Sequence, residues 1–184
     1  NVHRRMSQDT EIKAFSTTIP ASPKVALPVI TFNDTVTFRL NGHEIQVLHQ
    51  SNAHTDGDSI VYFKEANVMH TGDIWFNGLY PFIDTSSDGS VDGVIRTVKH
   101  ILTMVDDQTK IIPGHGKLGD KKALRRYLEM LTVVRTRMQK LIDEGKSLEQ
   151  VIALKPNADY DPTWGLAFMK PDQFTGILYD SLTR

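Results

Sequence analysis

The run Ile111-Ile112-Pro113-Gly114-His115-Gly116 places a histidine between two glycines, directly after a short apolar and β-branched segment. Two earlier stretches have the same character, namely His54-Thr55-Asp56-Gly57-Asp58 and His70-Thr71-Gly72-Asp73. Glycine at the edge of an apolar run marks the end of a strand, where several loops can converge on one site. The pattern therefore predicts a metal centre built from distant parts of the chain, with three candidate ligands: His54, Asp73 and His115.

Each candidate taken alone has an ordinary explanation, because histidine and aspartate in glycine-rich turns more often serve local hydrogen bonding. Together they supply the imidazole and carboxylate groups that a hydrolytic zinc site needs on short, rigid loops. Iron or manganese would accept the same ligands. The chain contains no cysteine, which excludes disulfides and thiolate metal sites.

Length and composition limit the classes of protein to consider. With 184 residues the chain should form a single domain, and its net charge of −1 gives no basic face for nucleic acid. The longest apolar runs, such as residues 25–30, are too short to span a membrane. The expected partner is therefore a small-molecule substrate.

The start of the chain bears on processing and compartment. It opens at Asn1 without a methionine and shows no signal peptide, so we expect a processed or truncated chain. A soluble chain without cysteine suits the periplasm or the extracellular medium as well as the cytoplasm.

Strands are expected in the first half and helices mostly in the second. Alternating apolar residues on both sides of Asn41-Gly42 predict a hairpin over 34–48. Further strands are expected at 59–64, 67–71 and 110–112. Periodic apolar residues and caps predict helices at 91–102, from 121 to about 144, at 148–152 and from Pro171 to about 182, with a short helix at 1–7 and a loop over 156–171.

In these motifs and in their order, the sequence resembles the metallo-β-lactamase superfamily of zinc hydrolases. The resemblance rests on 54–58 followed by the strand 59–63, on Thr71-Gly72-Asp73 after 68–70, and on 113–116; it covers about residues 25–116, and the later helices are compatible. It implies an α/β (α+β) fold, an αββα sandwich of two sheets with helices outside.

The resemblance also implies roles for the three ligands. His54 would complete a first metal site, Asp73 would bridge both metals, and His115 would belong to the second site. A complete site would hold two zinc ions and a hydroxide that attacks an ester, lactone, thioester or lactam-like substrate.

The sequence departs from the family in one large respect. The His-x-His-x-Asp-His run, which supplies four ligands, is absent, and residues 1–7 resemble the segment just downstream of it. We therefore expect residues 1–184 to be the C-terminal portion of the fold, with its N-terminal half missing. Such a chain would expose an apolar sheet face and associate with that half or with a copy of itself.

Two other functional interpretations stay open. The chain could be a catalytically incomplete fragment or a non-catalytic assembly module of the same fold, or the three motifs could be turns in an unrelated α/β domain. Four further ligands on a companion segment would favour the hydrolase.

The residues after Asp73 suggest a substrate pocket. Asn77, Tyr80 and Phe82 could line it, with the tyrosine hydroxyl donating to a developing oxyanion, or they could form an aromatic cluster between loop and core. His70 could support a metal ligand or be an ordinary strand residue. Residues 74–94 contain no lysine or arginine, hence no local cation for a substrate carboxylate.

Overall fold

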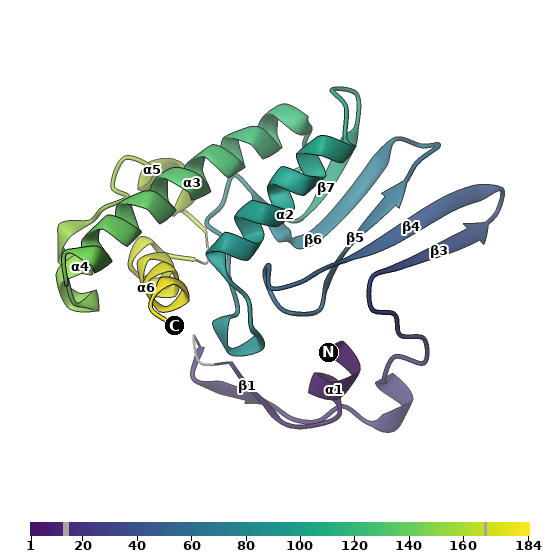
Figure 1. Cartoon of the computed structure of the whole chain (residues 1–184), viewed down its shortest axis with the longest axis horizontal. Coiled ribbons are helices and arrows are strands. Elements are labelled where there is room, and N and C mark those ends of the chain that lie inside the picture. Colours follow the sequence, from purple (N-terminus) through teal and green to yellow (C-terminus); the bar gives the residue numbers. More distant parts are fainter. Residues whose placement is uncertain (13–14, 168) are drawn as a thin grey trace.

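The computed structural model describes residues 1–12, 15–167 and 169–184 (Figure 1). The strands are β1 (Thr10–Ile12), β2 (Thr17–Ile19), β3 (Thr35–Leu40), β4 (His43–Gln50), β5 (Asp58–Phe63), β6 (Val68–Asn77) and β7 (Lys110–Gly116). The α-helices are α1 (Val2–Met6), α2 (Val91–Met104), α3 (Lys121–Asp143), α4 (Leu148–Leu154), α5 (Asp161–Trp164) and α6 (Pro171–Leu182). Two short 3-10 helices, η2 (Lys24–Ala26) and η3 (Thr85–Ser87), lie in the loops.

The main sheet has five strands in sequence order from β3 to β7. Strands β3 to β6 pair in antiparallel fashion, whereas β7 pairs with β6 in parallel. The hairpin predicted at 34–48 is confirmed, and Asn41 and Gly42 at its turn both have positive φ, at 52° and 79°. Two positive φ values at a two-residue turn match the right-handed twist of the flanking strands.

The helices cover the sheet on the side of β6 and β7. Figure 1 shows α2 and α3 side by side along these strands, with α6 next to them. Ser90 and Asp120 cap α2 and α3 by accepting hydrogen bonds from Gly93 N and Ala123 N, as expected for residues at N-caps. The buried side chains between the layers form one core; they include Ile60, Met69, Trp75, Val94, Val98, Ile111, Leu124, Tyr127 and Phe174.

The opposite edge of the sheet is less covered. In Figure 1 strands β3, β4 and β5 extend beyond the helical layer, and the apolar side chains of Phe38 and Leu40 are 42% and 59% exposed. The described residues thus form a five-stranded sheet with helices on it and a separate two-stranded sheet of β1 and β2. Among these residues no helix is long and apolar enough to cross a bilayer.

The structure corrects the predicted ends of two strands. β6 and β7 do not stop at residues 71 and 112 but continue through Asp73 and His115. The reason is that the two strands pair with each other in parallel, through Phe76 with His115 and Asn77 with Gly116. The prediction had ended both strands at their glycines and did not include this pairing. The hairpin of β1 and β2 and the short helix α5, within the predicted loop 156–171, were also not foreseen.

Candidate metal centre

His54 lies in the turn-rich segment 51–57 between β4 and β5. Its Nδ1 is 2.8 Å from the carbonyl oxygen of Phe82, and the two rings meet edge to face with centroids 5.5 Å apart. A carbonyl oxygen can only accept, so Nδ1 carries the proton, and in the neutral ring Nε2 keeps a free lone pair. His54 is therefore held in the tautomer that a metal ligand requires.

Asp73 lies in β6, just after a register shift at Gly72, whose φ is +56°. Its Oδ2 is 3.8 Å from His54 Nε2. Its Oδ1 is 3.4 Å from His115 Nε2. Each oxygen of one carboxylate thus faces the ring nitrogen of a different histidine.

His115 is positioned by pairing between β7 and β6. Its partner in register is Phe76, and the two rings stack with centroids 4.6 Å apart. The next residue, Gly116, has φ of +93°, and a Cβ there would lie 2.3 Å from the carbonyl oxygen of Asn77. The glycine after the histidine is therefore required by both backbone conformation and space.

The three side chains fit the donor set of a zinc or similar ion. Two ligands on one tetrahedral zinc, each at about 2.1 Å, lie roughly 3.4 Å apart. The distances of 3.4 Å and 3.8 Å from Asp73 to the two histidines are near this value. In addition, His54 Nε2, which carries a lone pair in this tautomer, lies 3.8 Å from a carboxylate oxygen, and two electron-rich atoms so close together favour a cation between them.

The ligand set is partial. Within residues 1–12, 15–167 and 169–184, no group of three or more histidine, cysteine, aspartate or glutamate side chains is arranged so that it could hold a metal ion. The geometry consists of two ligand pairs that share one carboxylate.

The predicted substrate contacts have other partners in the structure. Asn77 donates from Nδ2 to the carbonyl oxygen of Lys117 at 2.7 Å. Tyr80 is fully buried, stacks on Phe174, and donates its hydroxyl hydrogen to Asp161 Oδ1 at 2.8 Å. The Tyr80 hydroxyl therefore lies among the helices, which agrees with the predicted alternative of an aromatic cluster. A contact between Tyr80 and substrate stays a prediction that these interactions do not support.

Other polar residues near the ligands have structural partners. His70 accepts a hydrogen bond at Nδ1 from the backbone of Gly72 at 3.0 Å, which stabilises the bulge before Asp73. Asp58 accepts from the backbone and hydroxyl of Thr55, at 2.9 Å and 2.8 Å. Burial raises the pKa of the Asp58 carboxyl, although these hydrogen bonds act in the opposite direction.

Burial raises the pKa of Tyr80 and of Tyr127, and the hydrogen bond to Asp161 adds to the effect at Tyr80. Both groups favour their protonated form in the folded chain. Their contribution to stability is therefore full below the unfolded pKa of about 10 and is lost as the pH rises above it. We expect neither tyrosine to ionise before the chain unfolds. In an alkaline pH titration, part of the rise in phenolate absorbance should therefore be delayed until unfolding. Tyr80→Phe should reduce this delayed part.

The proteins similar to this chain are solved structures, since no family model and no curated protein matches its sequence. A metallo-β-lactamase from Pontibacter korlensis superposes with a TM-score of 0.51 and 20% identity, over 58% of this chain and 50% of that one. The metallo-β-lactamase DIM-1 gives 0.50 and 20%, over 59% and 50%. This chain has the metallo-β-lactamase fold.

A second kind of protein with this fold covers more of the chain. The stereoselective inverting sec-alkylsulfatase Pisa1 from Pseudomonas sp. superposes with a TM-score of 0.64 and 15% identity over 91% of this chain, but over only 28% of its own length. The chain thus spans half or less of these solved structures. At such identities the likeness establishes the metallo-β-lactamase fold alone.

Proposed function

We propose that this chain contributes His54, Asp73 and His115 to the metal centre of a dinuclear zinc hydrolase. The observation that carries the proposal is the Asp73 carboxylate, which offers one oxygen to each histidine at distances suited to shared metal ions. The metallo-β-lactamase fold supports it, because solved proteins with this fold are named as hydrolases of two kinds.

Each residue has a separate task in this proposal. The bound metals would supply Lewis acidity, activating water and polarising the substrate. Asp73 would bridge the two metal positions, and the hydrogen bond to Phe82 would keep His54 Nε2 directed at one of them. Stacking on Phe76 would restrict rotation of the His115 ring and so keep it directed at the second metal position.

The proposed substrates are esters, lactones, thioesters or lactam-like compounds. Because residues 74–94 carry no lysine or arginine, this part of the site offers no cation to a substrate carboxylate. We therefore propose that neutral esters and lactones are hydrolysed faster than β-lactams.

A non-catalytic module that associates with a companion segment or a second copy is the alternative. The exposed apolar side chains of Phe38 and Leu40 at the uncovered part of the sheet favour it. Both proposals require a partner for this face, but only the hydrolase requires metal.

The test is metal content, intact mass and light scattering of the native purified protein, followed by a panel of ester, lactone, thioester, β-lactam and alkyl sulfate substrates. We expect about two zinc ions per assembled unit. In His115→Ala the zinc affinity should fall at least about tenfold. His100→Ala, at an exposed position in α2, is the matched control. Assembly without metal and without hydrolysis would leave the non-catalytic module as the function.

A further inference from the structure

The segment that carries His54 is held from one side by residues 82–88. Asp84 N donates to His54 O at 2.9 Å, and Asp56 N donates to Ser87 O at 2.8 Å. Together with the contact between His54 Nδ1 and Phe82 O, these bonds tie the segment to the loop before α2. Residues 51–57 are turns and bends, so no strand pairing fixes His54 there.

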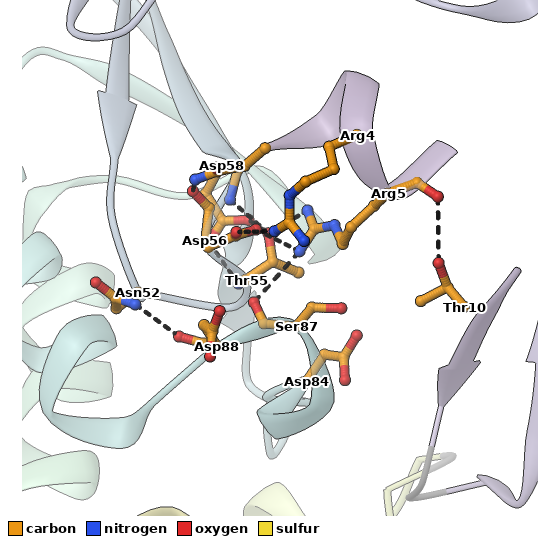
Figure 2. A network of polar contacts seen from close by, with 12 residues as sticks. Arg4, Arg5, Thr10, Asn52, Thr55, Asp56, Asp58, Asp84, Ser87 and Asp88 are labelled. Carbon is orange, nitrogen blue, oxygen red and sulfur yellow. Dashed lines mark hydrogen bonds and ion pairs between the residues drawn. The ribbon is translucent and has the colours of Figure 1, made fainter. Parts of the chain in front are cut away.

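From the other side the segment is contacted by helix α1, far away in sequence. Figure 2 shows the guanidinium of Arg5 pointing into the loop between Thr55, Asp56 and Ser87. Its NH1 is 2.5 Å from Asp56 Oδ1 and donates to Ser87 O at 3.2 Å, and its NH2 donates to Thr55 Oγ1 at 3.4 Å. One cation therefore joins both segments that position His54.

The helix approaches this loop too closely for a side chain at Gly57. A Cβ there would lie 2.5 Å from Val2 Cγ2 and 2.9 Å from Arg5 NH2. Asn1 adds a hydrogen bond from Nδ2 to Asp56 O at 3.1 Å. The contact is thus a packed one, not a single long side chain reaching across solvent.

The charges in this contact are largely removed from water. Asp56 is 6% exposed, and its Oδ1 has no hydrogen bond of good geometry among the described residues. The Arg5 side chain is 18% exposed, whereas that of Arg4, 3.7 Å from Oδ2, is 63% exposed. Arg5 is therefore the group that compensates the buried charge, and Arg4 is peripheral.

We propose that Arg5 is a positioning residue for the metal ligand His54. Its guanidinium holds Thr55 and Asp56 against Ser87, and this fixes the loop in which His54 Nε2 faces Asp73. The inference rests on the proposed function, since it treats His54 as a ligand. Through Arg5, helix α1 would hold the loop that carries His54 without itself contacting the metal centre.

The first test measures Co²⁺ affinity by titration, with the visible absorption of the bound ion as the signal. It compares the wild-type chain with four variants: Arg5→Met, Arg5→Lys, Arg4→Met and His54→Ala. We expect Arg5→Met to bind Co²⁺ about tenfold more weakly, in the range seen when groups supporting a ligand are removed. Arg5→Lys should recover only part of the affinity, because an ammonium cannot reach three separate acceptors in the arginine geometry. Arg4→Met should stay within about twofold of wild type.

A double variant separates positioning from the cost of an uncompensated charge. Arg5→Met combined with Asp56→Asn leaves no buried unpaired carboxylate, so the chain keeps its stability while the link to Ser87 is still missing. We expect Co²⁺ binding to stay about tenfold weaker in this variant. Wild-type affinity in the double variant would overturn the inference, because the effect of Arg5→Met would then come from charge burial alone.

A measurement without metal keeps the two proposals distinct. The ¹⁵N shifts of the His54 ring report the fraction with the proton on Nδ1, which we expect to fall in Arg5→Met and in the double variant but not in Arg4→Met. If His54→Ala binds Co²⁺ as tightly as the wild-type chain does, the metal proposal fails. The ¹⁵N shifts then still decide the role of Arg5. An unchanged His54 ring in both Arg5 variants would overturn the positioning role.

Discussion

Replacing Asp73 by asparagine is expected to lower zinc affinity at least about hundredfold. An asparagine amide keeps one acceptor oxygen and puts a donor group where the second oxygen was, so it cannot serve two metal positions. It also removes the negative charge between the two histidines. Structural zinc sites with four ligands bind with about 10–16 kcal/mol, which makes each ligand worth roughly 3 kcal/mol, or about a hundredfold.

Thermal unfolding with and without zinc measures this effect independently of catalysis. Zinc at about a hundred times its Kd should stabilise the wild-type chain by about 2.7 kcal/mol, and at the same zinc concentration this increase should fall to about 0.4 kcal/mol or less in Asp73→Asn. Without zinc the two chains should unfold at similar temperatures, because the Asp73 side chain is 40% exposed. Asp107→Asn, at an exposed position after α2, is the control that should keep the full response to zinc. An equal zinc response in Asp73→Asn would show that Asp73 is not a ligand.

The local part of the fold was predictable because it depends on neighbouring residues. The Asn41-Gly42 turn fixes the register of β3 and β4, and the caps at Ser90 and Ser147 set the starts of α2 and α4. The parallel pairing of β6 with β7 joins residues about forty positions apart, so no local signal could show that both strands continue past their glycines.

The candidate ligand residues were easier to find in the sequence than the groups that hold them in place. Asp73 and His115 stand next to glycine, and His54 lies three residues before Gly57. The structure places Asp73 within 3.8 Å of His54 and 3.4 Å of His115. Phe82 acts through its backbone carbonyl, which any residue would offer, and Arg5 has no spacing relation to the loop that it contacts. Tyr80 had the right residue type near Asp73, but its burial depends on helix packing that the sequence does not display.

Replacing Gly114 by alanine is expected to disturb both the sheet and the candidate metal centre. A Cβ at this position would lie 2.1 Å from Asp73 Oδ1 and 2.7 Å from the carbonyl carbon and oxygen of Gly72. Real Cβ atoms do not approach so closely, and the backbone of Gly72 cannot turn away as a side chain could. Either β7 must separate from β6 or Asp73 must leave the space between the histidines.

We expect Gly114→Ala to lower the free energy of unfolding by about 3 kcal/mol, in the upper range for an overpacked site, and to weaken zinc binding about tenfold. Chemical unfolding followed by circular dichroism measures the first effect, and zinc titration of the folded variant measures the second. The matched control is Gly176→Ala in α6, where an added Cβ meets no atom within 4 Å. That substitution should leave zinc binding unchanged and raise stability by up to about 1 kcal/mol, because alanine favours the helix over glycine. If Gly114→Ala were as stable as wild type and bound zinc equally well, the close approach of β7 to Asp73, on which the shared carboxylate depends, would be wrong.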